Sequence, residues 1–303
     1  MHEWVLMMRT RRGFTLNEML ISMTILAVVG LAFTKILRYQ TTYFAHETML
    51  RTARTVARTA TNLMISDLRA VQDSGAVDSV AADGKLVRIF VPYRYGLVCA
   101  STGSTVTVSL LPSDSSSSNM SVYKGFAFRN STGRYTYVFP GNPTTSDIPI
   151  ASSNPAACTG TGSGQAQINT LSVGGRAGDI LDLHWNGNGG GGPGVSTLAP
   201  VFLFQKVSYS FRTSGVYPNM LGLWRNVEGG QNEELAAPFD TTARFRFYQP
   251  GDDTSRTTPP NVAVIRGLEL VLVARAPKAS SSNTSSNTVK MATSVFFKNV
   301  RSF

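Results

Sequence analysis

The residue types best suited to metal binding or catalysis lie in two short acidic stretches. Asp252 and Asp253 are adjacent in the turn "QPGDDTS". Carboxylates and loop carbonyls there suit Ca²⁺, although the spacing is not that of an EF-hand. Asp179, Asp182 and His184 lie close together, but on a strand Asp182 and His184 share one face while Asp179 points the other way. This arrangement favours an ordinary strand start over a metal site.

The chain shows no arrangement of residues typical of a catalytic centre. We recognise no Ser/His/Asp or Cys/His constellation and no paired carboxylates placed for acid–base chemistry. An anchored periplasmic enzyme would need a buried cluster of titratable groups in a pocket, and the sequence offers no candidate. We therefore expect a protein that is not an enzyme and has no cofactor; calcium near Asp252 and Asp253 is the less favoured alternative.

Cys99 and Cys158 are the two cysteines of the chain. They do not form a CxxC pair, and the three scattered histidines complete no zinc pattern. If this part of the chain lies outside the cytoplasm, one disulfide closing a loop of about 60 residues is the natural pairing. Two unpaired buried thiols are the alternative.

The composition favours a β-rich protein exported from the cytoplasm. Charged residues make up 15% of the 303 residues, well below the usual fraction of about 25%. Ser, Thr, Gly and Asn take their place, as in secreted proteins with long loops. The net charge is +10. A surface this basic is suited to nucleic acid, anionic lipid or an acidic partner, although we favour a solvated cationic surface without a specific partner.

An apolar segment near the N-terminus is interrupted by one charge. No charged residue occurs from Met19 to Thr34, and extension back to Phe14 adds only Glu18. As a helix, residues 14–34 would be about 31 Å long, one hydrocarbon thickness. A charge at the bilayer centre costs roughly 2.5–3.5 kcal/mol, so Glu18 requires an explanation. The segment is preceded by Arg9, Arg11 and Arg12, which by the positive-inside rule place the N-terminus in the cytoplasm.

Two simpler interpretations of this segment remain open. An ordinary secretory signal could be cut after Ala32, because Gly30 and Ala32 are small residues at the spacing that signal peptidase prefers. However, the apolar stretch exceeds the usual h-region, and the helical pattern continues past the cut. A plain single-pass anchor is the other alternative.

The stretch "RRGFTLNEMLISM" resembles the class III signal of type IV prepilins and pseudopilins. The resemblance rests on a basic leader that ends in Gly13, on Phe14 directly after it, and on Glu18 at the fifth mature position before an apolar helix. It implies that a prepilin peptidase/methyltransferase cuts between Gly13 and Phe14 on the cytoplasmic side and methylates the Phe14 amine. Asn17 is polar where many family members carry an aliphatic residue, a departure that leaves these three positions intact.

This resemblance gives Glu18 a physical function. Cleavage creates a charged amine on Phe14, and the Glu18 carboxylate of one subunit can neutralise the Phe14 amine of its neighbour in a filament. Two charges that are costly alone in a low dielectric become tolerable together, most favourably in the correct axial register. The alternative is a carboxylate that only reaches toward the membrane interface.

A helical pattern continues beyond the membrane segment. Residues of small or medium size recur every seven positions and form one stripe: Ile36, Tyr43, Leu50, Ala57, Met64 and Val71, with Ala53 and Ala60 beside them. No proline or glycine occurs from Leu31 to Ser74, so we predict one helix over 14–72 with Gly75 as its C′ residue. The stripe favours packing on the chain's own globular domain over a free coiled coil.

The amphipathic part of the helix carries several arginines. Arg51, Arg54 and Arg58 fall on neighbouring turns and are suited to acidic residues of other subunits or to the phosphates of DNA. We favour subunit packing, because a filament would cover these arginines.

From residue 85 onward the pattern has period two, as in "QKVSYSFRT" (205–213) and "ARFRFYQ" (243–249). We predict further antiparallel strands at 85–93, 104–110, 121–128, 134–139, 179–184, 219–226, 264–276 and 290–299, and flexible loops at 112–119, 186–194 and 278–288. The predicted fold is α+β and type IV pilin-like. Its parts are a leader (1–13), a transmembrane helix (14–34), an amphipathic continuation (35–74) and an extracytoplasmic β domain (75–303).

The order of these strands is similar to that of W-type minor pilins and J-type minor pseudopilins, with Leu223-Trp224-Arg225 in place of their Leu-Tyr-Arg-like step. The resemblance implies a minor pilin that helps to initiate and build the pilus with major and minor pilins, at or near its tip. Such a subunit starts in the bacterial inner membrane and ends in the filament at the cell surface. A minor pseudopilin of a type II secretion system is the rival within the class, and a pilus-associated DNA receptor for natural transformation is the rival from another class.

Overall fold

The computed structural model describes residues 15–72, 74–115, 121–140, 149–152, 158, 178–184, 194–258, 261–275 and 288–297. The leader predicted at 1–13 and the junction between Gly13 and Phe14 lie outside these residues. The chain divides into two compact units, Met1–Arg51 and Thr52–Phe303. The first contains most of the long N-terminal helix, and the second contains the end of that helix together with a large sheet.

Helix α1 (Leu16–Ala70) confirms the predicted long helix, but it ends earlier than expected. The backbone N–H of Val71 donates to the carbonyl of Leu68, an i to i−3 bond that tightens the last turn. Gly75 is therefore not the C′ residue. It lies within the separate 3-10 turn η1 (Ser74–Ala76), which leads into the first strand.

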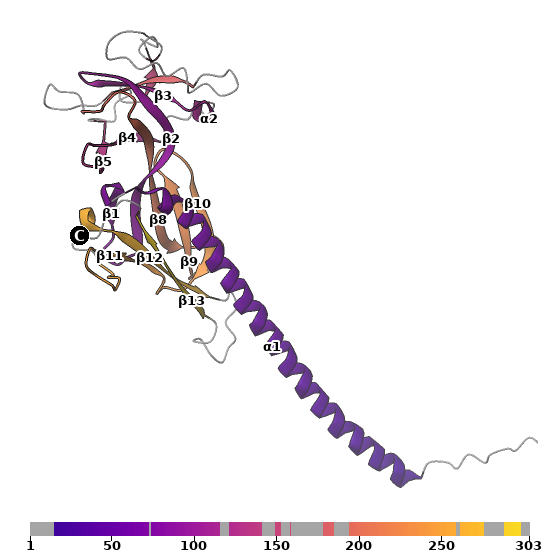
Figure 1. The fold of residues 1–303 in the computed structure, drawn as a ribbon. Coiled ribbons are helices and arrows are strands. Elements are labelled where there is room, and N and C mark those ends of the chain that lie inside the picture. Colours follow the sequence, from indigo (N-terminus) through magenta and orange to yellow (C-terminus); the bar gives the residue numbers. More distant parts are fainter. Residues whose placement is uncertain are drawn as a thin grey trace, which may run out of the picture. The chain divides into compact units, whose positions relative to one another are not determined.

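Thirteen strands within the described residues form one sheet, and every pair is antiparallel (Figure 1). The strands are β1 (Val77–Val80), β2 (Leu86–Thr102), β3 (Thr105–Leu110), β4 (Tyr123–Arg129), β5 (Tyr135–Val138), β6 (Ile150–Ala151), β7 (Ile180–His184), β8 (Pro200–Thr213), β9 (Leu221–Val227), β10 (Asn232–Phe239), β11 (Arg244–Tyr248), β12 (Gly267–Arg275) and β13 (Thr288–Phe296). Their order along the main path is β11-β12-β10-β9-β8-β2-β3-β7-β6, with β1, β4, β5 and β13 paired off this path. The α+β prediction is confirmed.

The two longest strands connect two hydrophobic cores. Strands β2 and β8 pair continuously from Leu86↔Ser210 to Leu97↔Pro200, with one irregularity near Pro92. At one end their side chains join a core that includes the end of α1 and strands β9, β11 and β12. At the other end they join a smaller core with β3, β4 and β7. The strands extend beyond the prediction, and the added residues Val98 and Leu203 are buried in this second core.

The end of α1 lies on the sheet through a narrow stripe of side chains (Figure 1). The buried residues of this stripe are Ala53, Ala57, Ala60, Met64, Leu68 and Val71. Three alanines on one face let the helix backbone approach the strands closely. The predicted stripe is thus confirmed after residue 52. Before it, Ile36 and Tyr43 are 53% and 63% exposed, so the sevenfold repeat there meets no surface within its own unit.

Some elements depart from the sequence-based prediction. Strands β1, β6 and β10 were not expected, because β1 and β6 are short and β10 carries adjacent glutamates and a proline without clear alternation. Of the loop predicted at 112–119, Pro112–Ser115 form the short helix α2, and Thr288 of the loop predicted at 278–288 begins β13. The remainder of those two loops, and 186–193, lie outside the described residues.

Candidate functional site

Glu18 and Thr15 form a reciprocal cap at the start of α1. The backbone N–H of Glu18 donates to Thr15 Oγ1 at 3.3 Å, and the backbone N–H of Thr15 donates to Glu18 Oε2 at 3.2 Å. The Thr15 hydroxyl also contacts the same carboxylate oxygen at 3.2 Å. This is the capping-box arrangement, in which two orphan N–H groups of the first helical turn are satisfied by side chains. Sequence reasoning missed it, although the spacing Thr-x-x-Glu carries the signal.

The cap leaves half of the carboxylate available. Both hydrogen bonds that the Glu18 carboxylate accepts use Oε2, and Oε1 has no hydrogen-bond partner among residues 15–72 and the other described segments. A carboxylate can accept several hydrogen bonds, so Glu18 retains capacity for a further cationic or N–H donor. Gly13 and Phe14, the predicted processing residues, lie outside the described residues.

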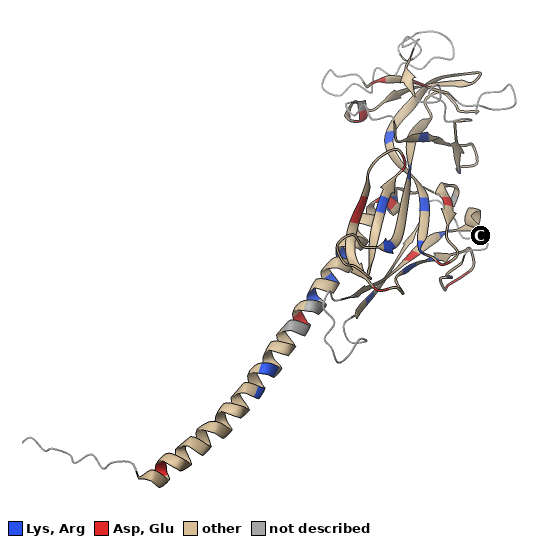
Figure 2. Cartoon of the chain, turned by 180° about the vertical axis from the view of Figure 1, so that it is seen from behind, with Lys and Arg blue, Asp and Glu red and all other residues tan. Residues whose placement is uncertain are grey.

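The first part of α1 is apolar on every side. The stretch Leu16–Phe44 is long and apolar enough to cross a membrane, and none of its most apolar window is buried within the chain. Figure 2 shows few charged residues on this part of the helix. A helix that is apolar all round is suited to lipid or to other helices, because water would solvate it poorly.

The end of the helix is attached to the sheet by a polar contact as well as by the alanine stripe. Asp67 Oδ2 accepts a hydrogen bond from the Tyr209 hydroxyl at 2.6 Å and an ion pair from Arg225 Nε at 3.1 Å. Burial of Tyr209, together with the nearby Asp67 carboxylate, raises the pKa of its hydroxyl well above the usual value. Asp67, Tyr209 and Arg225 therefore fix the helix on strands β8 and β9. Sequence reasoning did not identify this contact, since its members are 142 and 158 residues apart.

The arginines predicted to meet a partner are on the surface. The side chains of Arg51, Arg54 and Arg58 are all exposed. Because the stripe at Ala53, Ala57 and Ala60 faces the sheet, Arg54 and Arg58 lie outside the buried face. Whether they bind acidic residues of another subunit or DNA stays a prediction.

The two cysteines lie together in the second unit. Cys99 on β2 and Cys158 form a disulfide, with Cα atoms 4.9 Å apart. Both sulfur-bearing side chains are buried, and Leu97 and Ile180 pack against them. The bond holds residue 158 against the strand, so its contribution is structural.

The acidic stretch at 179–184 connects strands. Asp182 is buried, and its Oδ1 accepts hydrogen bonds from Thr107 at 2.7 Å and Ser152 at 2.8 Å. His184 Nδ1 lies 3.2 Å from the Thr105 hydroxyl on the paired strand. These contacts satisfy buried polar groups across β3, β6 and β7. The arrangement fits the ordinary strand interpretation.

The adjacent carboxylates at 252–253 do not act together. Asp252 forms an ion pair with Arg256 Nε at 2.7 Å and a hydrogen bond with its Nη2 at 2.9 Å, whereas Asp253 is exposed. A calcium ion at this turn would therefore compete with a guanidinium for Asp252. The described residues contain no group of three or more His, Cys, Asp or Glu side chains placed to hold a metal ion.

Comparison with known proteins identifies the N-terminal segment. A family model described as the prokaryotic N-terminal methylation motif matches residues 8–34. No curated protein and no solved structure matches the chain. The matched residues include the predicted cleavage junction, Glu18 and the start of the apolar helix, and they fit the class III signal of type IV pilins and pseudopilins.

The motif and the fold together define a class of protein. A pilin-type motif indicates a structural protein, processed by a prepilin peptidase and assembled with other pilins, not an enzyme. The apolar helix is consistent with membrane anchoring before assembly. The motif thus supports a type IV pilin-like or pseudopilin protein, and the described residues have an α+β fold.

Proposed function

We propose that this protein is a minor type IV pilin that helps to initiate and build the filament as a subunit at or near its tip. The observation that carries the proposal is the methylation motif at residues 8–34, which runs directly into a helix that is apolar on all sides and unburied in its own chain. Residues 1–13 are the leader, 14–34 span the inner membrane, 35–70 continue the helix, and the β domain at 75–303 lies outside the cytoplasm.

The contact that drives assembly is the one between Glu18 and a neighbouring subunit. Cleavage after Gly13 and methylation of Phe14 leave a cationic amine one residue before Thr15. Glu18 Oε2 remains on its own cap, while Oε1 accepts the Phe14 amine of the adjacent subunit. An ion pair in low dielectric is favourable only at short distance, so this contact sets the axial register.

The size and strand order of the second unit favour a minor subunit. Strand β9 carries the Leu223-Trp224-Arg225 step of the W-type resemblance, and Arg225 binds Asp67 on the helix. A minor pseudopilin of a type II secretion system shares the processing and the helix. Gene neighbourhood separates the two: pilus motor and retraction genes support the pilin, whereas a secretin with exported hydrolases supports the pseudopilin.

Mass spectrometry of the mature N-terminus tests the processing step. Protein recovered from membranes should begin with N-methyl-Phe14, so its mass should be that of the precursor without its first thirteen residues, increased by one methyl group. An intact Met1 or a start at Phe33 after cleavage by signal peptidase would contradict the proposal.

Replacement of Glu18 tests the assembly step. Glu18→Ala should insert into the membrane at the wild-type level but be lost from sheared filaments. The matched control is Glu47→Ala, which removes a carboxylate from the same helix outside the motif and should leave incorporation unchanged. Normal incorporation of Glu18→Ala would disprove the function assigned to the carboxylate.

Binding of DNA is the second candidate function, favoured by the exposure of Arg51, Arg54 and Arg58. Phosphate contacts predict an affinity for duplex DNA that falls steeply with salt. Replacement of all three arginines by glutamine should abolish this binding, and absence of binding at low salt would exclude the function.

A further inference from the structure

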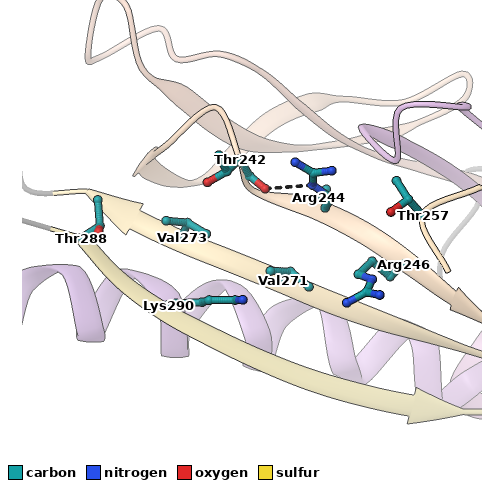
Figure 3. A pocket seen from close by; sticks show the side chains of 8 residues that line it. All are labelled: Thr242, Arg244, Arg246, Thr257, Val271, Val273, Thr288 and Lys290. Carbon is teal, nitrogen blue, oxygen red and sulfur yellow. Dashed lines mark hydrogen bonds between the residues drawn. The ribbon is translucent and has the colours of Figure 1, made fainter. Parts of the chain in front are cut away.

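The outward face of β11, β12 and β13 contains a depression of about 400 Å³. On this face the register places Arg244 beside Val271, and Val273 beside Lys290. Figure 3 shows the two valines on β12 flanked by Arg244 on one neighbouring strand and Lys290 on the other. The depression is also lined by Arg246 and by the three threonines Thr242, Thr257 and Thr288. It therefore has an apolar floor and cationic, hydroxyl-bearing walls.

The cations on the two sides have free donor capacity. Arg244 uses Nε to donate to the carbonyl of Thr242 at 3.1 Å, which orients the side chain and leaves both terminal nitrogens for another acceptor (Figure 3). Lys290 is exposed and forms no salt bridge within the described residues. The connection at 276–287 between β12 and β13 contains no Asp or Glu, so it supplies no carboxylate to either cation.

The third cation marks the end of the depression. Arg246 lies 3.7 Å from Glu269 Oε2 and also donates to the carbonyl of Ser255. Glu269 is directly opposite Arg246 in the register and is further engaged by the Ser255 hydroxyl. The free positive charge is thus concentrated between Arg244 and Lys290, with a carboxylate next to it on β12.

This charge distribution selects among anionic ligands. A guanidinium presents parallel N–H groups that match a carboxylate or a phosphate, and an ammonium adds a compact point charge. Duplex DNA carries one negative charge per about 1.7 Å of its axis, so a strand along β12 would place phosphates over Glu269. None of the eight lining residues is aromatic, so the depression offers no stacking platform for bases. A protein segment with well-separated carboxylates need not place a negative charge over Glu269. Its apolar side chains can contact the floor formed by Val271 and Val273.

We propose that this depression binds an extended acidic segment of a partner protein. A carboxylate of that segment bridges Arg244 and Lys290, and an apolar side chain two residues away, on the same face of the extended segment, rests on Val271 and Val273. Neighbouring strands are about 4.8 Å apart, and the register offsets Arg244 from Lys290 by two residues along β12, so their backbones are about 12 Å apart. Both long side chains can therefore reach one carboxylate above β12. The proposal does not depend on the assembly function of Glu18, which lies in the other unit.

A peptide titration with the full chain in detergent micelles tests this site. The probe is a fluorescein-labelled octapeptide of repeating Glu-Ser-Val-Ser, in which Glu and Val share one face of the extended chain. Its binding is measured by fluorescence anisotropy at low salt. The double variant Arg244→Gln, Lys290→Gln should bind at least about tenfold more weakly, because two charge-assisted contacts are lost. The matched control is Arg88→Gln, Arg134→Gln, which removes the same charge from exposed arginines elsewhere and should change affinity less than about twofold.

Two further ligands test whether binding depends on the carboxylates of the peptide and whether DNA uses the same depression. The same peptide with Gln in place of Glu should not bind, and a 20-base-pair duplex should bind no more weakly to the double variant than to its control. Three results would overturn the proposal: no binding of the acidic peptide, equal loss of affinity in both double variants, or a duplex that binds this depression more tightly than the peptide. Should the double variant unfold, Lys290→Gln alone, at an exposed side chain, is expected to weaken peptide binding about three- to tenfold.

Discussion

The two ends of helix α1 are apolar for different reasons. From Met19 to Thr34 no charged residue interrupts the apolar surface of the helix, and this surface remains uncovered within the chain, whereas in the last turns only one stripe is apolar and it is buried on the sheet. An apolar surface without an internal partner must be covered by lipid or by another molecule. One continuous helix thus combines a segment that needs external contacts with a segment that is complete within the subunit.

The acids of the two segments follow the same division. Asp67 has its partners within the chain, Tyr209 and Arg225, so it stabilises the second unit. Glu18 caps its own helix through one oxygen only. Equivalent substitutions in the two segments should therefore affect different measurements: the free energy of unfolding for the buried segment, and membrane or filament properties for the exposed one.

The largest expected change in the free energy of unfolding comes from replacing a buried methionine of the helix, with an exposed methionine as its control. Met64 is 0% exposed and Met23 is 71% exposed. Met64→Ala should lower the free energy of unfolding of the second unit by about 2–5 kcal/mol, because it leaves a cavity in the core. Met23→Ala should leave it unchanged. Urea titration of the full chain in micelles, followed by tryptophan fluorescence, measures both, and a comparable loss in the two variants would contradict the division of the helix.

The hydroxyl of Tyr209 should contribute the next largest effect and a pH dependence. Tyr209→Phe removes a hydrogen bond to a carboxylate, which costs about 1.5–3 kcal/mol at neutral pH. Because the folded pKa of Tyr209 is raised, the unfolded chain loses this proton first, above pH of about 10. The contribution of Tyr209 to the free energy of unfolding should therefore be constant below that pH and fall above it.

Unfolding titrations between pH 8 and pH 11.5 separate the two contributions of Tyr209. The fall above pH of about 10 should be shallower in Tyr209→Phe than in the wild type. A smaller fall remains, because burial raises the pKa of Tyr93 to about 12. Identical slopes in the wild type and the variant would show that Tyr209 does not titrate with a raised pKa.

A pair of alanines tests the same difference between the two helix segments by adding volume instead of removing it. Ala60 is buried under the sheet, whereas Ala27 is exposed in the apolar segment. Ala60→Leu should destabilise the second unit by about 1–3 kcal/mol, since the helix must move away from the strands. Ala27→Leu should not, and it should retain membrane insertion. The same titration compares the two variants, and a neutral Ala60→Leu would mean that the stripe is loosely packed.

The smallest effect is expected at the helix start. Thr15→Ala removes the side chain that caps α1, at a local cost of about 0.5–2 kcal/mol. The expected result is faster amide hydrogen exchange confined to the first turn, with no change in the unfolding of the second unit. Thr15→Ser keeps the hydroxyl and serves as the control. Unchanged exchange in Thr15→Ala would mean that the cap is not populated.

The parts of the fold that could be predicted are those specified by local sequence patterns. The long helix was predictable because the stretch from Leu31 to Ser74 lacks glycine and proline, and β8, β11 and β12 follow from alternation and apolar content. The early end of α1 was not predictable, since Gly75 has the sequence signal of a terminator while tertiary contacts direct the chain into η1. Strand β10 was missed because its pairing with β9 outweighs a sequence of low strand propensity.

The candidate site divides in the same way. A motif of neighbouring residues, from Gly13 to Glu18, is legible in the sequence because its recognition and its helix cap depend on spacing along the chain. The attachment of Asp67 to Tyr209 and Arg225, and the meeting of Arg244 with Lys290 across β12, exist only in the tertiary structure. Strand register brings such residues together from distant parts of the chain, and no local spacing specifies which strands will be neighbours.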